Sequence, residues 1–377
     1  MSISRRSFLR SSVAATAALP FMENLTTDYC HAAEAGPDVV DFLVGFAPDA
    51  IRLNRNENPY GPSPMAIKAI ERGLNQSHRY IIPPVQLRNV LAGIHSVDNK
   101  MVRLGTGSGE ILSAVAVAYL REGGNMVSTL QTYRSTPRMA GSIGAKVHWV
   151  KLKPDWSYDV QGLLAAVDSE TKIFYLVNPN NPTGTTLSYD EVKSIADALP
   201  KDVLFFIDEA YVHFLPDGPN GIDLLKAGYD NVFVTRTFSK VYGLAGLRIG
   251  YGVGHPDVIK KVSAFQYTLM NLAGYGGAIA ALQDHGHVKK FVDHAKTCKT
   301  FYKKELTALG LKHIIGASPL LMVDVGEDSE AFVEKMAKEN VHVRKGADWD
   351  MPQHVRISYG LDEDNKAAIA ALKKLMT

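Results

Sequence analysis

The chain has 377 residues, of which 46% are hydrophobic and 21% are charged, the composition of an ordinary globular protein with room for two domains. Its formal net charge of +2 argues against nucleic acid as the main partner, because such binding usually needs a concentrated basic face. The 31 glycines and 18 prolines are scattered along the chain, so we expect no low-complexity tract.

The first 35 residues differ from the rest of the chain. Arg5 and Arg6 belong to a Ser-Arg-Arg-Ser-Phe-Leu-Arg run, which precedes a short, mildly apolar stretch and then Ala33-Glu34-Ala35. This order resembles a twin-arginine export signal, so we expect residues 1–35 to be a signal peptide and the mature protein to be periplasmic. A basic, flexible start is the alternative, and the protein would then stay in the cytoplasm. The apolar stretch is too short for a stable membrane anchor.

Between residues 100 and 255, short apolar runs alternate with amphipathic stretches. The runs predict strands at residues 101–104, 126–129, 147–150, 173–177, 203–207, 232–235 and 249–253. Several are almost continuously apolar, as is typical of strands covered by helices on both faces. The stretches between them predict helices at residues 109–120, 136–143, 160–167 and 189–199. This alternation favours an α/β domain with a mostly parallel sheet.

The pattern changes after residue 256. It predicts helices at residues 256–265, 278–283 and 287–309, strands at 320–325, 341–343 and 355–357, and a last helix at 362–375. We therefore expect a large domain at residues 76–285 and a smaller α+β domain at 286–377, which the segment 36–75 joins. A cleft between two such domains is a common place for a small-molecule site. Cleavage would remove Cys30, so Cys298 would have no partner for an internal disulfide.

Lys240 ends the run 235–240, directly after an apolar strand. A lysine in that position is partly desolvated, which lowers its pKa and frees the amine to attack an aldehyde. Ser239 and Arg248 flank it with a hydroxyl and a fork-shaped cation, and both suit a phosphate. A solvated loop lysine beside a structural arginine is the alternative, and it would explain an isolated Ser-Lys pair better.

Asp208 and Tyr211 follow the apolar strand 203–207, at the sheet edge where α/β proteins bind ligands. Asp208 could keep a pyridine nitrogen protonated, and Tyr211 could donate to the phenolic oxygen of the same ring. A helix N-cap or a metal ligand is the alternative for Asp208. We predict no metal site in this chain.

Three further features follow strands in the same way. The run 178–184 has two Asn-Pro steps and a glycine, a rigid turn that could aim an amide at a ligand. The run 105–110 offers free backbone N–H groups at the start of a helix, which suits a phosphate, although it is neither a P-loop nor a Rossmann fingerprint. Tyr133 could stack on a flat heterocycle. Plain turns and a packing tyrosine are the alternatives.

These features jointly supply what a flat, phosphorylated pyridine aldehyde requires: a lysine, a carboxylate, hydroxyl and amide donors, a stacking ring and a phosphate cup. The chain resembles fold type I pyridoxal 5′-phosphate (PLP) enzymes of the aspartate aminotransferase superfamily, most closely the histidinol-phosphate aminotransferase branch. The motifs that carry this resemblance are 53–63, 79–80, 107–110, 178–184, 208–211, 239–240, 248 and 355–357.

The resemblance implies a large PLP-binding domain, with helices covering a mostly parallel sheet, and a smaller α+β domain. The implied activity is PLP-dependent transamination, which moves an amino group between an amino acid or amine and a 2-oxo acid. Lys240 would form the aldimine with PLP and then move the proton, while Asp208 would pair with the pyridinium nitrogen. Asn181 and Tyr211 would bind the phenolic oxygen, and Tyr133 would stack on the ring.

The resemblance also implies how the phosphate and the substrate are bound. The phosphate would contact Ser108, Gly109, Ser239 and Arg248, with Tyr80 reaching in from a second subunit, so a homodimer is expected. Arg356 would bind the substrate carboxylate, and Arg344 could meet a distal anionic group. The sequence departs from the family pattern at 81–82 and 319–320, which leaves the substrate open.

Two other functions stay open at this point. A PLP-dependent decarboxylase or lyase would use the same residues on the same fold. A non-catalytic exported binding protein could keep the fold without the chemistry. The sequence gives neither the amino donor nor the acceptor, nor whether histidinol phosphate is a substrate.

Overall fold

The structure is a computed structural model that describes residues 46–47, 49–81, 85–215, 218, 220–267 and 270–376. The chain divides into two compact units, Met1–Ala50 and Ile51–Thr377. In the described part of the first unit, the Ala50 N–H donates to the Ala47 carbonyl at 3.0 Å. The predicted signal peptide, its cleavage site and Cys30 lie outside the described residues. The second unit contains everything described below.

A seven-stranded sheet organises the large domain, in the order β2-β8-β7-β6-β5-β3-β4. β8 runs antiparallel to β2 and β7, whereas the other neighbours are parallel. The prediction of a mostly parallel sheet is confirmed, and each predicted strand is present with bounds shifted by one or two residues. The strands are β2 Val102–Thr106, β3 Asn125–Thr129, β4 Lys146–Val150, β5 Thr171–Val177, β6 Leu204–Asp208, β7 Val232–Thr237 and β8 Ile249–Gly254.

Helices cover both faces of this sheet because its strands are apolar on both sides. Leu204 and Phe206 of β6 belong to one buried cluster, while Phe205 and Ile207 belong to the other. The first face is covered by α6 Ser108–Leu120, α7 Ser135–Ser142 and α11 Pro256–Ser263; the second is covered by α5 Val85–His95, α8 Val160–Ala165, α9 Tyr189–Ala198 and α10 Ile222–Lys226. Of these helices, α5 and α10 were not predicted.

The smaller α+β domain has an antiparallel sheet in the order β12-β13-β10-β9. The predicted helices and the predicted strands at 320–325, 341–343 and 355–357 are confirmed, but the sequence pattern missed α14, β9 and β12. The elements are α13 His285–Ala308, β9 His313–Ile315, β10 Leu320–Asp324, α14 Ser329–Lys338, β11 Val341–His342, β12 Arg344–Lys345, η5 Gly346–Trp349, β13 His354–Ser358 and α15 Asp362–Met376. The described contacts do not define where the large domain ends and the smaller one begins. The predicted boundaries at residues 75 and 285 therefore remain predictions.

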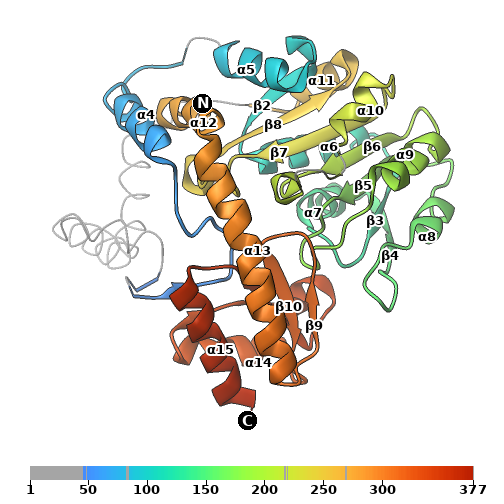
Figure 1. Ribbon diagram of the computed structural model, residues 1–377. Helices are drawn as coiled ribbons and strands as arrows, with labels where there is room; N and C mark the ends of the chain where they lie inside the picture. The colour runs from blue at the N-terminus through green and yellow to red at the C-terminus, as the bar shows by residue number, and fades with distance from the viewer. Residues whose placement is uncertain are drawn as a thin grey trace, which may run out of the picture. The chain divides into compact units, whose positions relative to one another are not determined.

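The segment after residue 50 contacts elements on either side of it in the fold, β11 and α12 Leu272–Gln283. Its strand β1 Ile51–Arg52 pairs in parallel with β11. Its helix α4 Pro64–Leu74 then lies beside α12 (Figure 1). The two helices approach closely, since a Cβ at Gly73 would lie 2.5 Å from the Ala273 Cα. The residues between β1 and α4 are thereby held in place from both ends.

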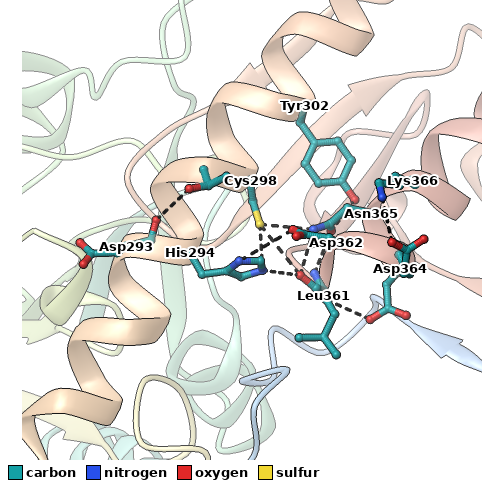
Figure 2. Close-up of polar contacts among 12 residues, drawn as sticks. Asp293, His294, Cys298, Tyr302, Leu361, Asp362, Asp364, Asn365 and Lys366 are labelled. Carbon is teal, nitrogen blue, oxygen red and sulfur yellow. Dashed lines mark hydrogen bonds and ion pairs between the residues drawn. The ribbon is translucent and has the colours of Figure 1, made fainter.

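A polar cluster joins α13 to the start of α15 (Figure 2). We call His294, Cys298, Tyr302, Gly360 and Asn365 the α13–α15 cluster. The Asn365 amide donates to the Cys298 sulfur at 3.3 Å and to the Gly360 carbonyl at 2.9 Å, and its oxygen accepts from Tyr302 at 3.0 Å. The His294 Nε2 lies 3.2 Å from the same sulfur. Cys298 is a free, buried cysteine.

No helix among the described residues is long and apolar enough to span a bilayer.

Candidate active site

A cavity of about 660 Å³ lies at the carboxyl ends of the parallel strands and is closed by the smaller domain. Its walls carry every residue that the sequence singled out for the site, with one exception. These residues are Ser108, Gly109, Tyr133, Asn181, Asp208, Tyr211, Ser239, Lys240, Arg248, Arg344 and Arg356. The exception is Tyr80, which is 91% exposed and lies outside this cavity.

Lys240 projects into the cavity from the loop that follows β7. Its Nζ donates a hydrogen bond to the Arg55 carbonyl at 2.9 Å. Burial, reinforced by the positive charge of Arg356, lowers the pKa of the Lys240 amine to about 8. About a tenth of this amine is therefore unprotonated at pH 7, far more than for a free lysine, as a nucleophile for an aldehyde requires.

Asp208 is the last residue of β6 and only 2% exposed. One carboxylate oxygen accepts the Ala210 N–H at 3.1 Å, and the other accepts the Tyr175 hydroxyl at 3.3 Å. Burial raises the pKa of the Asp208 carboxyl to about 7. A cationic ring nitrogen beside it would favour the carboxylate again. The described residues hold no group of His, Cys, Asp or Glu side chains arranged for a metal ion.

Arg356 on β13 connects the two domains across the cavity. Its Nη1 donates to the Asn181 side-chain oxygen at 2.9 Å, and its Nη2 donates to the Asn54 carbonyl at 2.6 Å. The Trp349 ring lies 4.9 Å from the guanidinium carbon. Burial lowers the pKa of Arg356 to about 10, so the group stays cationic at neutral pH. Its buried Nε has no partner among the described residues, which leaves a donor for a substrate anion.

Tyr211 and Asn181 reach the cavity from the loops after β6 and β5. The Tyr211 hydroxyl accepts a hydrogen bond from the Asn56 amide at 2.8 Å. Burial raises the pKa of the Tyr211 phenol to about 12, so this hydroxyl keeps its proton and can donate. Tyr133 is 39% exposed at the mouth of the cavity, where a ring can still cover its face.

The remaining predicted residues form a cup that suits a phosphate. No side chain in the described chain caps the N-terminus of α6, which leaves the first backbone N–H groups of this 13-residue helix as donors. The Arg248 Nη1 lies 3.5 Å from the Ser239 hydroxyl and donates to the Ala245 carbonyl at 3.0 Å. A Cβ at Gly107 would lie 2.3 Å from the Arg248 Nη2, so only glycine permits this approach. The donor set fits the phosphate of PLP.

Tyr80 lines a separate cavity of about 580 Å³ beside α4 and α12. Ile81 lines the same cavity, and Leu320 is fully buried in β10. Neither of these departures from the family pattern faces the active-site cavity, and Ile82 lies outside the described residues. Their positions within one subunit therefore do not identify the substrate.

Sequence reasoning missed several residues of the walls. Asn54, Arg55, Asn56 and Glu57 line the cavity, although the sequence marked their motif only as part of a resemblance. The available signal was their place in the run 53–63, where positions 54–58 are five consecutive polar residues. Trp349 and Arg138 carried no such signal.

Comparisons with known proteins agree with this geometry. Residues 48–372 match the family described as aminotransferase class I and II. Histidinol-phosphate aminotransferase 1 of Nitrosococcus oceani is 35% identical over 87% of this chain and 89% of that protein. Histidinol-phosphate aminotransferase 2 of Pseudomonas aeruginosa is 36% identical over 88% of this chain and 91% of that protein.

Among solved structures, the histidinol-phosphate aminotransferase of Sinorhizobium meliloti in complex with pyridoxal-5′-phosphate has a TM-score of 0.81 and 28% identity, covering 91% of this chain and 94% of that one. The fold, the residues of the cavity and the related proteins all indicate the same family. The chain belongs to the aminotransferase class I and II family and is a PLP-dependent aminotransferase.

Proposed function

We propose that the enzyme transfers an amino group between a donor that carries an acidic group and a 2-oxo acid. The observation that carries this proposal is that Lys240, Asp208 and Arg356 face one cavity, the first two from the large domain and the third from the smaller one. A donor held by Arg356 would place its amine next to Lys240. Histidinol phosphate, named in the relatives, is one candidate donor.

The roles of the protein's own side chains follow from their positions. Arg356 binds and orients an acidic group through its free Nε and its forked Nη atoms. Lys240 takes the proton from the donor carbon and returns it, which its lowered pKa permits. Asp208 keeps the ring nitrogen protonated, while Asn181 and Tyr211 hold the phenolic oxygen. When bound, PLP supplies the electron sink that spreads the developing negative charge.

A panel of amino donors tested against several 2-oxo acids, with histidinol phosphate included, examines this proposal. We expect pyridoxamine phosphate to form stoichiometrically when an effective donor is added without an acceptor. Release of CO₂ or elimination products instead, with no pyridoxamine phosphate, would favour a decarboxylase or lyase. If the protein bound ligands equally well before and after Lys240→Ala and showed no cofactor absorbance, a binding protein would be the better description.

We also propose a homodimer in which Tyr80 of one subunit completes the site of the other. Tyr80 and Tyr267 are 91% and 86% exposed, an unusual state for large aromatic side chains in a lone subunit. Mixing inactive Tyr80→Ala and Lys240→Ala chains should restore part of the activity, because hybrid dimers contain one intact site. Each variant mixed with itself is the control. A monomer by sedimentation, or no recovery on mixing, contradicts the proposal.

The export proposal is tested separately. Replacing Arg5 and Arg6 by lysine should keep the protein in the cytoplasm, since twin-arginine export requires that pair. Fractionation with a cytoplasmic marker measures the outcome. Unchanged delivery to the periplasm would refute this route, and cytoplasmic wild-type protein would refute export.

A further inference from the structure

A small annexe opens beside the active-site cavity. It has a volume of about 270 Å³ and shares Tyr133, Arg138, Arg344 and Trp349 with the main cavity, so the two adjoin. One face of α7 forms its floor, because Ser135, Arg138 and Ser142 are spaced by three and four residues along the helix. The annexe extends the substrate side of the site, away from Ser239 and Arg248.

Three arginines line the annexe, and acidic side chains already hold two of them. The Arg344 Nε donates to an Asp348 carboxylate oxygen at 2.5 Å. Arg134 forms an ion pair with Asp350, which follows η5 directly. The charge on each of these two guanidinium groups is therefore largely compensated before any substrate arrives.

Arg138 is the third arginine, and its charge is uncompensated. Its side chain is exposed, its guanidinium makes neither a hydrogen bond nor an ion pair with any residue that the structure describes, and the Tyr133 phenol lines the same annexe. The Ser135 hydroxyl also lines the annexe, whereas the Ser142 hydroxyl donates to the Arg138 backbone carbonyl at 2.9 Å. An unpaired guanidinium on a cavity wall favours a carboxylate or a phosphate.

We propose that Arg138 determines donor specificity by binding a second, distal anionic group of the substrate in this annexe. The inference rests on the proposed function, in which Arg356 binds the first acidic group. It gives Arg138 the distal contact that the sequence assigned to Arg344, since the Arg344–Asp348 pair adds little net charge. The substrate class is thus an amino compound with two anionic groups, the distal one a carboxylate or a phosphate.

The test compares donors that differ only in the distal charge, using PLP-loaded enzyme. The carboxylate arm compares glutamate with glutamine, and the phosphate arm compares O-phosphoserine with serine, so that each pair keeps the carboxylate for Arg356 and differs only in the distal charge. We expect wild-type kcat/KM to favour the charged donor in at least one arm, and that arm identifies the source of the anion. Arg138→Met should reduce the preference by about 10- to 100-fold, the range of a charge-assisted hydrogen bond. Arg138→Lys should retain much of it.

Matched controls separate Arg138 from its neighbours. The double variant Arg344→Met with Asp348→Asn removes a neutral pair as a unit, and it should keep the preference within about threefold. Arg121→Met removes an exposed arginine that lines another cavity, at the start of β3 and β4, and should have no effect. An unchanged charge preference in Arg138→Met would overturn the proposal, as would its loss in the double variant alone.

A binding measurement keeps this inference separate from the proposed reaction. Glutarate and its monoamide cannot transfer an amino group, so calorimetric titration measures anion recognition without turnover. We expect glutarate to bind more tightly, and Arg138→Met to remove that difference. If no donor turns over but this difference depends on Arg138, the proposed function fails and the anion site stands. If donors turn over and neither readout discriminates charge, the anion site fails and transamination stands.

Discussion

Two of the molecule's buried polar clusters have opposite character. In the α13–α15 cluster, the polar atoms of Asn365 bond to Tyr302, Cys298 and Gly360, and burial raises the pKa of the Cys298 thiol to about 12. In the cavity, the Arg356 Nε and the Asn54 side-chain oxygen are buried without partners in the described chain. There the pKa values of Lys240 and Asp208 move to about 8 and about 7, close to neutral pH.

The contrast shows why residue types alone do not mark a catalytic site. A cysteine and a histidine 3.2 Å apart have the composition of a nucleophile and its base, yet this thiol keeps its proton and does not line the active-site cavity. Polar groups that satisfy one another stabilise the packing of two helices. Polar groups left with spare donors and near-neutral pKa values on a cavity wall are available for chemistry.

The largest expected effect comes from removing the lysine. Lys240→Ala should reduce amino transfer by at least about 10³-fold, because both the covalent attachment and the proton-moving amine are lost. Steady-state turnover and the absorbance of the bound cofactor measure the change. Lys226→Ala removes an exposed lysine of α10 and serves as the control. Near-normal turnover in Lys240→Ala would show that the polar groups of the cavity, like those of the α13–α15 cluster, are not needed for the reaction.

Removal of the carboxylate should have the next largest effect. Asp208→Asn should lower kcat by about 10²- to 10³-fold, since a neutral amide cannot stabilise a protonated ring nitrogen in a buried site. The same kinetic assay applies, with Asp257→Asn as a control at an exposed carboxylate. A reduction of kcat below threefold would mean that the buried Asp208 carboxylate, like Asn365, contributes to packing and not to the reaction.

The pH dependence of cofactor uptake sharpens the contrast in pKa values. In protein freed of PLP, the Lys240 amine reacts in its unprotonated form, so uptake should rise about tenfold per pH unit below pH 8 and level off above it. The rate of uptake rises with pH because deprotonation produces the reactive amine, and the lowered pKa of Lys240 increases the fraction of that form at neutral pH. Stopped-flow absorbance measures the rate. A free lysine derivative is the control, and its rate should keep rising to about pH 10.

The smallest effect on catalysis should come from the other cluster. Asn365→Ala should lower the free energy of unfolding by about 1–3 kcal/mol, because it leaves buried partners unsatisfied. Turnover per folded molecule should stay within about twofold of wild type. Urea unfolding and kinetics on the same samples measure both. A tenfold loss of turnover at unchanged stability would show that this cluster contributes to the reaction.

The sequence alone predicted those parts of the fold and of the site that depend on a local pattern of residues. β5, β6 and β7 are almost continuously apolar, so the strands and the residues at their carboxyl ends, including Asp208 and Lys240, could be placed in advance. β12 has two residues and β9 has three, too few for any periodicity to appear. The antiparallel direction of β8 also has no local signature.

Other parts of the site depend on contacts between residues far apart in the chain. The Asn56 N–H donates to the Ser358 hydroxyl across 302 residues, and no local pattern predicts such a pairing. Arg344 and Asp348 are only four residues apart, but their ion pair depends on the turn of η5, so the sequence assigned Arg344 a role without its partner. The sequence could not identify Arg138, because its importance depends on having no ion-pair partner among the described residues.

The contact between Asn56 and Ser358 has a consequence for biosynthesis. One wall of the cavity comes from residues 54–57, and the opposing Arg356 comes from β13, only two residues before Ser358. A nascent chain on the ribosome has the lysine and the phosphate cup long before it has the wall that Arg356 completes. The site is therefore assembled only after β13 has been made and its end has packed against residues 53–56.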